Sequence, residues 1–310
     1  MATIVQIAPG DFFNDLFFRV FRNRTGGTDL DFVSQSSVSF TTVNNADTTL
    51  TANFTGIGFT LGPEPSGGTI SAITLRESGL AIAQITGLAV PLDEFTAALT
   101  DFNDNANDSA FDTLFATLNF DYSVDPFVTA GVSFEGDDLA DTISGGVGND
   151  TLSGFGGADT ITGGDGEDII RGGDGFDVAL FNYVYRFSYF DLNGNYIYAD
   201  YGAEVFLNNG YAFDGYGGSD SLYEIEGVDG TDGQDGIYGD SDANRLNGNG
   251  DYDRIGGGAG NDTLNGGDGD DLLIFGGAFA PGGTQGADVD LASGVAFDTF
   301  GDTDRIDLFE

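Results

Sequence analysis

The chain has 310 residues and a formal net charge of −42, because 51 Asp and Glu side chains stand against nine Arg and no Lys. It has no Cys and no His, which excludes disulfides, thiolate metal sites, HExxH zinc sites and catalysis by an imidazole base. A compact fold with this charge repels itself, so we expect divalent cations to neutralise it. The charge also argues against nucleic acid as a partner, and no apolar run reaches membrane-spanning length.

The first 130 residues show little repetition and are rich in Thr and Phe. The segments with strand-like patterns are 49–61, 69–76 and 80–86. The last two of these are separated by Ser78-Gly79, which predicts a hairpin. The segments with helix-like patterns are 11–24, 91–99 and 109–118. We therefore expect a small α+β domain over residues 1–130.

A short acidic stretch, residues 101–112, places oxygen-bearing side chains at its first, third, fifth, seventh, ninth and twelfth positions. This spacing is similar to that of an EF-hand calcium loop. However, Ala106 stands where such a loop needs Gly, and Asp112 stands where it has a bidentate Glu. We interpret the stretch as a polar loop that caps the following helix, with a calcium loop as the alternative.

A nonapeptide repeat fills two blocks, residues 131–180 and 230–274. Gly145–Ser153 is a representative unit, with Gly at its first, second and fourth places, Asp at its sixth and an apolar residue at its eighth. The sixth places are Asp141, Asp150, Asp159, Asp168, Asp177, Asp235, Asn244, Asp253, Asp262 and Asp271. The eighth places are Ile143, Leu152, Ile161, Ile170, Ala179, Ile237, Leu246, Ile255, Leu264 and Leu273.

The residue types at these places predict a metal site. Glycines allow the positive φ angles of a tight turn, and such a turn aims its carbonyl oxygens inward. The sixth-place Asp adds a carboxylate, so each turn offers oxygen ligands suited to calcium. The glycines that we assign to these sites are Gly145, Gly148, Gly163, Gly166, Gly257, Gly260, Gly266 and Gly269. The last three residues of each unit predict a short strand whose apolar side chain points into a narrow core.

Two non-repetitive segments follow the blocks, over residues 181–229 and 275–310. The first begins with aromatic residues at every second position from Phe181 to Tyr189, which is strand spacing with one aromatic face. Parts of it recur in the second, since Gly202–Leu207 parallels Gly286–Leu291. We therefore expect two copies of a repeat block followed by a β insert. The aromatic face is predicted to cap the repeat core, with a sugar platform or a subunit interface as alternatives.

The nonapeptides resemble those of the RTX (repeats-in-toxin) family. The resemblance implies two parallel β-roll solenoid blocks with β inserts, in a mainly β fold preceded by the α+β domain. It also implies that each Ca²⁺ lies between turns two repeats apart, which gives about six sites in all, with affinities in the range of extracellular modules. Type I secretion to an extracellular, calcium-rich environment is implied as well.

No catalytic constellation stands out, so we expect a protein that is not an enzyme. The expected role is a structural or adhesive cell-surface protein that binds calcium and associates with itself or with surface polysaccharide. Two alternatives stay open, a calcium-dependent carbohydrate-binding adhesin that uses the Tyr-rich insert, and the secretion and folding module of a larger exoenzyme.

Overall fold

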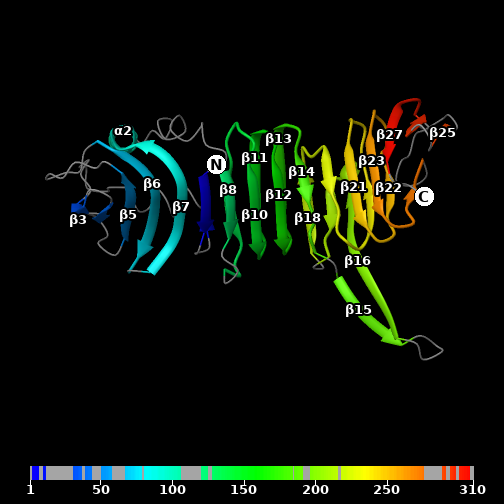
Figure 1. Cartoon of the computed structure of the whole chain (residues 1–310), viewed down its shortest axis with the longest axis horizontal. Helices are drawn as coiled ribbons and strands as arrows, with labels where there is room; N and C mark the ends of the chain where they lie inside the picture. The colour runs from blue at the N-terminus through cyan, green and yellow to red at the C-terminus, as the bar shows by residue number, and fades with distance from the viewer. Residues whose placement is uncertain are drawn as a thin grey trace. The chain divides into compact units, whose positions relative to one another are not determined.

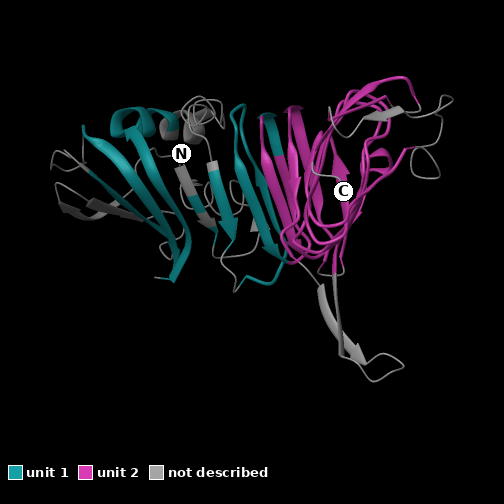
Figure 2. Cartoon of the chain, turned by 45° about the vertical axis from the view of Figure 1, so that its right-hand side comes forward, with its two compact units in different colours: residues 1–147, 154–157 teal, residues 148–153, 158–310 magenta. Residues whose placement is uncertain are grey.

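The computed structural model (Figure 1) describes the backbone of most of the chain. The described residues are 2–6, 10–11, 31–36, 39–43, 50–57, 67–78, 80–105, 120–124, 128–183, 185–190, 196–215, 218–275, 288–290, 294–297 and 300–307. The chain divides into two compact units, coloured in Figure 2. Unit 1 holds residues 1–147 and 154–157, and unit 2 holds residues 148–153 and 158–310. None of the helical segments within the described ranges has both the length and the apolar character that a membrane crossing needs.

Unit 1 contains an antiparallel sheet that continues into parallel strands. Its elements are β1 Ala2–Gln6, β2 Gly10–Asp11, β3 Asp31–Ser36, β4 Ser39–Val43, β5 Leu50–Ile57, β6 Thr69–Glu77, β7 Leu80–Pro91, α2 Leu92–Asn105, β8 Phe120–Val124, β9 Val132–Glu135 and β10 Thr142–Val147. Strands β3 to β7 pair antiparallel in sequence order, and β7 then pairs with β1. From β1 onward the pairing to β8 and β10 is parallel. The parallel pairing that begins at β1 and β8 thus continues into β10, which belongs to the first repeat block.

The predicted hairpin between the second and third strands of this sheet is confirmed. Glu77 pairs with Leu80, and Ser78 takes a left-handed φ of 51° in the turn between them. Strand β7 continues to Pro91, five residues beyond the predicted end at Thr86, because its apolar side chains go on alternating into the core as far as Val90. Helix α2 covers this core by packing Phe95 edge-on against Phe54, with ring centroids 5.4 Å apart.

The calcium-loop alternative for residues 101–112 is wrong for the part that the structure describes. Helix α2 runs to Asn105 instead of ending at Leu99, so the first five positions of the candidate loop are helical. An EF-hand loop holds its first, third and fifth side chains around the ion in an irregular backbone, whereas Asp101 to Asn105 belong to a regular helix. The predicted helices over 11–24 and 109–118 lie outside the described residues, except for Asp11 in β2.

Unit 2 is built from short strands that stack as a parallel solenoid. Strand β11 Thr151–Gly157 carries residues of both units, and the rest of the unit 2 elements are β12 Thr160–Asp165, β13 Ile169–Gly175, β14 Val178–Leu180, β15 Tyr185–Phe190, β16 Tyr196–Phe206, the 3-10 helix η2 Leu207–Asn209, β17 Tyr211–Phe213, β18 Ser219–Tyr223, β19 Gly227–Asp229, β20 Gln234–Tyr238, β21 Arg245–Gly250, β22 Arg254–Gly256, β23 Thr263–Asp268, β24 Leu272–Leu273, β25 Asp288–Asp290, β26 Val295–Phe297 and β27 Thr303–Asp307. This architecture confirms the predicted mainly β fold with parallel β-rolls.

The apolar eighth-place residues form the solenoid core, as expected, except that Leu273 in β24 is only half-buried. The strands of unit 2 form two ladders of parallel strands, one in each of its two sheets. Along each ladder the eighth-place residues pair in register, so that Leu246 lies beside Leu264 and Ile237 beside Ile255. Each of these four side chains is fully buried. Because the strand period is two, this register keeps one apolar side chain of every turn inside and sends its neighbours outward.

One ladder of unit 2 runs straight across the first insert, which the repeat pattern alone did not predict. Strand β14, at the end of the first block, pairs in parallel with β19, and β19 pairs in parallel with β21 of the second block. The second ladder is instead extended by the insert itself. There β18, β17 and β16 form an antiparallel meander between β13 and β20, and both of its outer strands pair in parallel with the solenoid.

The second insert repeats this meander. Strands β25, β26 and β27 pair antiparallel, and β27 then joins β23 in parallel. Gly210 and Gly294 occupy equivalent hairpins with φ of 68° and 70°, and their carbonyls accept the N–H of Leu222 and of Ile306. The duplication seen in the sequence is therefore a duplication of structure.

Candidate metal sites

Glycines at the second and fourth places of each repeat form the turns. Gly267 and Gly269 have φ of 107° and 152°, a region that favours glycine. A Cβ at either position would overlap a backbone carbonyl oxygen of the turn two repeats earlier, that of Asn249 or Asp251. The carbonyls of one turn are therefore directed at the next turn on the same side of the solenoid.

Glycines at the first place leave room for the sixth-place carboxylate. A Cβ on Gly163 would overlap Oδ2 of Asp168, and a Cβ on Gly257 would overlap Oδ2 of Asp262. At Gly248 the same position meets both Oδ2 of Asp253 and, 2.5 Å away, a carbonyl oxygen of the following turn. Each first-place glycine thus opens a space that is lined by oxygen atoms.

The sixth-place residues are buried and form a ladder of hydrogen bonds with a step of 18 residues. In each step, the backbone N–H of one sixth-place residue donates to Oδ1 of the next on the same side. The pairs are Asp150–Asp168 (2.8 Å), Asp159–Asp177 (2.8 Å), Asp235–Asp253 (2.9 Å), Asn244–Asp262 (2.9 Å) and Asp253–Asp271 (2.9 Å). The structure therefore brings these predicted site residues together in the order that the repeat implied.

Asp141 lies in unit 1 and is also buried, and its Oδ2 accepts the N–H of Asp137 at 3.0 Å. Asn244 differs from the other nine because it has no charge. Its Oδ1 accepts the N–H of Asp240 at 2.9 Å, and its Nδ2 donates to the carbonyl of Glu226. An amide offers a metal one neutral oxygen where an aspartate offers an anionic one.

Three further acidic residues accept the same kind of backbone hydrogen bond as the sixth-place residues, and they were missed in the sequence analysis. The N–H of Asp168 donates to Oδ1 of Asp220 at 3.0 Å, that of Asp177 to Oε2 of Glu226 at 2.9 Å, and that of Asp262 to Oδ1 of Asp304 at 3.1 Å. The signal that would have found them is an acidic residue two positions before a buried apolar one. Leu222, Val228 and Ile306 are those apolar residues.

Four of the sixth-place acids keep a second carboxylate oxygen that the protein does not satisfy. Among the described residues, no group donates a hydrogen bond to the buried Oδ2 atoms of Asp168, Asp177, Asp253 and Asp271. A buried anionic oxygen without a partner is costly, so burial raises the pKa of Asp168 to about 6 and that of Asp253 to about 8. Burial is the largest cause of both shifts, and neighbouring carboxylates contribute to them. These oxygens need either a proton or a cation.

Calcium fits this donor set. Within the described part of the chain, no point is surrounded by three or more His, Cys, Asp or Glu side chains, so an ion would take its remaining ligands from the turn carbonyls. A mixed set of carboxylate and carbonyl oxygens is typical of calcium, whereas zinc prefers nitrogen and sulfur. The residues that would hold the ions are the sixth-place acids together with the turn carbonyls, and the bound ions would neutralise charge and link adjacent turns.

Comparison with protein families agrees with this geometry. The family model described as RTX calcium-binding nonapeptide repeat (4 copies) matches residues 135–170, 156–179 and 253–278. These segments cover less than half of the chain and contain most of the sixth-place acids. No curated protein matches the chain.

Two glycines of strand β21 provide a test of the oxygen-lined spaces. Gly248→Ala places a methyl group against Oδ2 of Asp253 and the carbonyl of Gly266, whereas a Cβ at Gly250 has no neighbour closer than 3.7 Å. We expect Gly248→Ala to raise the calcium concentration needed for folding about tenfold or more, since overpacking costs about 1–3 kcal/mol. Gly250→Ala should change it little. Calcium titrations followed by circular dichroism measure both, and equal effects of the two variants would contradict the assignment.

The raised pKa values predict an unusual dependence of the metal-free fold on pH. The pKa of Asp220 is raised by burial to about 7 and that of Asp253 to about 8, above the ordinary value of 3.8. Above pH 4 the folded state then binds more protons than the unfolded state, so its stability falls as the pH rises through 8. In excess EGTA, the folded fraction should be larger at pH 5 than at pH 8.

With calcium the direction reverses, because protons compete with the ion for the same oxygens, and binding should tighten from pH 6 to pH 8. The non-titrating variant Asp253→Asn should weaken both trends. A folded fraction in EGTA that grows with pH would contradict the prediction.

Proposed function

The chain is an RTX repeat protein, and on this basis we propose that it works outside the cell as a calcium-folded structural or adhesive subunit of a surface layer, filament or biofilm matrix. The observation that carries the proposal is the ladder of buried carboxylates, in which the second oxygens of Asp168, Asp177, Asp253 and Asp271 have no donor among the described residues. It makes the fold conditional on a cation that is abundant outside cells and scarce inside them. The RTX resemblance further supports type I export of the unfolded chain.

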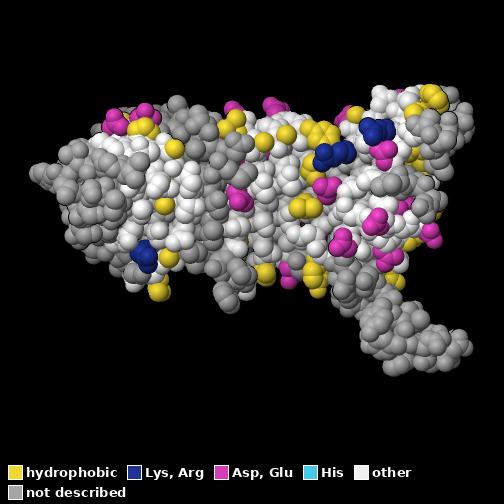
Figure 3. All heavy atoms as spheres, in the orientation of Figure 1, with side chains coloured by type: hydrophobic (Ala, Val, Ile, Leu, Met, Phe, Trp, Pro, Cys, Tyr) yellow, Lys and Arg dark blue, Asp and Glu magenta, His cyan; other side chains and the backbone are white. Residues whose placement is uncertain are grey.

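Charge supports the same conclusion. The net charge of −42 disfavours the compact state, and on the face shown in Figure 3 Asp and Glu side chains are spread over the solenoid. Without calcium, the carboxylates of adjacent turns repel one another. With calcium, binding free energy becomes folding free energy, so that the chain stays unfolded before export and folds after it.

We propose no catalytic role. The chain has no His or Cys, and a structural role accounts for the acidic groups with raised pKa values that line the turns. The oxygens of Asp168, Asp220 and Asp253 accept backbone N–H groups of neighbouring turns, which commits them to holding the solenoid together.

Self-association is supported by the edge of the second insert. Its strand β25 is the counterpart of β16, and the outer edge of β16 pairs in parallel with β20. The outer edge of β25 pairs with none of the described strands. An edge without a partner among the described strands can accept a strand of a second copy by backbone hydrogen bonding.

Carbohydrate binding is a second candidate, favoured by aromatic side chains on the outer face of the insert sheet. Phe213 pairs with Ser219 across the strands, and Tyr223 lies four residues further along the same strand, so both rings share one face. Tyr223 is 48% exposed and Phe213 47% exposed. The Arg171 guanidinium lies 4.9 Å above the Tyr223 ring. Flat rings beside a hydrogen-bond donor suit a sugar.

A calcium titration of the full chain, followed by imaging of the same sample, tests the proposed function. We expect circular dichroism to show a largely unfolded chain in EGTA and β structure at millimolar calcium, with magnesium much less effective. Electron microscopy and light scattering of the calcium-loaded sample should show assemblies. A chain that keeps its fold and melting temperature in EGTA would refute calcium-dependent folding, and monomers alone at millimolar calcium would refute the assembly role.

A glycan array probed with calcium-loaded protein separates the second candidate from the first. If the insert face binds sugar, Tyr223→Ala should lose up to about tenfold in binding, because a stacking ring contributes about 0.5–1.5 kcal/mol. The matched control is Tyr252→Ala, which removes a ring that is 39% exposed in a repeat turn. Absence of any calcium-dependent binding, or equal losses in both variants, would exclude this site.

A further inference from the structure

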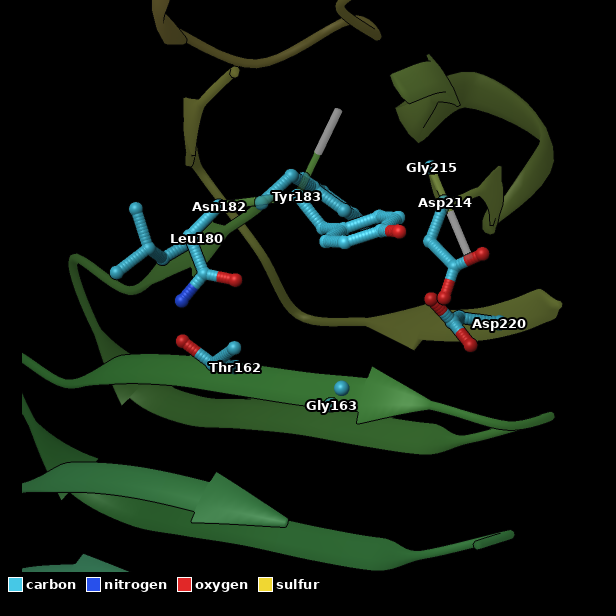
Figure 4. A pocket seen from close by; sticks show the side chains of 10 residues that line it. Thr162, Gly163, Leu180, Asn182, Tyr183, Asp214, Gly215 and Asp220 are labelled. Atoms are coloured by element: carbon cyan, nitrogen blue, oxygen red, sulfur yellow. The ribbon is translucent and has the colours of Figure 1, made fainter. Parts of the chain in front are cut away.

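Two hollows of unit 2 differ in what they can hold. The first is lined by Asp214, Asp220 and Tyr183, and Figure 4 shows the two carboxylates pointing toward one another beside the Tyr183 ring. It has about 10 Å³ of room for the centre of a water-sized sphere, which suits a single water molecule. The second is a groove of about 710 Å³ by the same measure. Of the two, only the groove has space for an organic ligand.

The groove lies on the outer face of the parallel strands β19, β21, β23 and β27, which are neighbours in one sheet. The side chains that alternate with the buried core residues of these strands form two rows in register. The first, which we call the arginine row, holds Gly227, Arg245, Thr263 and Arg305, and the second, the amide row, holds Asp229, Asn247, Asn265 and Asp307. Because adjacent strands are about 4.8 Å apart, both rows repeat with that spacing along the solenoid.

The arginine row is unusual in so acidic a chain. It holds two of the nine Arg residues, about 10 Å apart across Thr263, and both are exposed. Figure 3 shows Arg side chains, in dark blue, close together on one face of the solenoid. Arg305 donates from Nε to Asp307 at 2.9 Å, whereas no carboxylate of the described residues pairs with Arg245. A guanidinium has five N–H groups, so both side chains keep donors for a ligand.

An aromatic ring takes the place of the side chain that Gly227 lacks. A Cβ on Gly227 would lie 3.2 Å from the Phe176 ring, so this ring covers the start of the arginine row. The Arg245 guanidinium lies 5.4 Å from the ring centroid, a cation–π distance that helps to fix its position. Phe176 is 38% exposed, so part of the ring is open to a ligand beside the guanidinium.

The amide row is linked by its own hydrogen bonds. Nδ2 of Asn265 donates to Oδ1 of Asn247 at 2.7 Å, and Nδ2 of Asn247 donates to Oδ1 of Asp229 at 3.2 Å. At the other end of the row, Asp307 accepts from Arg305. Both carboxylates of the groove are therefore bound to donors of the protein. With two Arg and two Asp in its lining, the groove is neutral in a chain whose net charge is −42.

We propose that this groove binds an anionic polysaccharide, which lies along the solenoid with its acidic groups on Arg245 and Arg305 and a sugar ring on Phe176. Guanidinium groups suit carboxylate and sulfate, because their N–H groups match two oxygens at once. A flat apolar ring suits the face of a sugar, and the amide and hydroxyl side chains between the two Arg offer hydrogen bonds to sugar hydroxyls. A polymer of sugar rings is itself periodic, so it can repeat its contacts from strand to strand.

This site is distinct from the Tyr223 face of the insert. Tyr223 belongs to β18, in the other sheet of unit 2, and its ring lies beside Arg171. The groove needs neither that face nor self-association. The inference rests on one part of the proposed function, the calcium-dependent fold, because the two rows exist only when the strands are stacked.

Binding of the calcium-loaded full chain to polymers of known charge tests the site. Dextran sulfate carries sulfate groups, hyaluronate carries carboxylates, and dextran is the neutral control. We expect saturable binding to at least one acidic polymer at physiological salt, weaker binding as salt is added, and none to dextran. The acidic polymer that binds more tightly identifies the preferred acidic group.

Replacing each arginine separates the groove from the rest of the surface. Arg245→Gln and Arg305→Gln should each raise the dissociation constant about fivefold, the effect of losing one exposed ion pair. The matched control is Arg254→Gln, which removes a half-exposed arginine of β22 in the other sheet. It should change the dissociation constant less than about twofold, since salt screens charges that lie beyond about 8 Å.

Phe176→Leu gives a readout that a purely electrostatic contact does not move. It removes the flat ring without a change of charge, so binding should weaken about threefold or more while its salt dependence stays the same. The two arginine variants should instead reduce the salt dependence. Circular dichroism in calcium shows that each variant is folded before its binding is compared.

The outcomes separate this inference from the proposed function. A chain that does not fold on calcium binding overturns both. A folded wild-type chain that binds neither acidic polymer, or equal losses in Arg245→Gln and Arg254→Gln, overturns only the polysaccharide site. Sedimentation in which Arg245→Gln dissociates an oligomer, without a loss of polymer binding, would assign the groove to a second copy of the chain and overturn the polysaccharide site as well.

Discussion

The structure depends on one recurring interaction, in which a buried carboxylate accepts the backbone N–H of a turn two repeats away with one oxygen. At Asp168, Asp177, Asp253 and Asp271 no group of the described residues donates to the second oxygen. The first oxygen fixes the register of neighbouring turns, as between Asp235 and Asp253. The second makes the turn unstable by itself, because a buried anion without a partner is costly. Calcium resolves this conflict, so that cohesion of the turns and ion binding are one event.

The same interaction explains how the solenoid tolerates its inserts. Asp220, Glu226 and Asp304 take the sixth place where the glycine pattern is weak or lost, and each accepts the N–H of the preceding turn on its side. The insert meander replaces one strand of a ladder, while the apolar residues Leu222, Val228 and Ile306 keep the core column filled. An acidic residue and an apolar residue two positions later are therefore the minimum requirement for a turn, and the glycines add the space for an ion.

The acidic residue that each turn requires explains the high negative charge of the chain and its dependence on calcium. A regular turn of the solenoid buries a single large apolar side chain, as at Leu152, Ile161 and Ile170, which is a small core to set against the repulsion of 51 acidic residues. Calcium converts the acidic turns from a source of repulsion into a source of stability. The proposed export in the unfolded state and folding outside the cell rest on this dependence on calcium.

The sequence by itself determined the repeat, its register, its core positions and the residue types of the calcium turns, because a period of nine forces chemically equivalent atoms into equivalent places. The hairpin at Ser78 was also readable, since turn chemistry is local. Only the tertiary structure decided that helix α2 continues through the acidic stretch to Asn105, and that β14 pairs directly with β19. It alone brought Asp214 and Asp220 to one cavity. Such contacts join residues that are far apart in the chain, and no local pattern records which distant backbone will supply the missing partner.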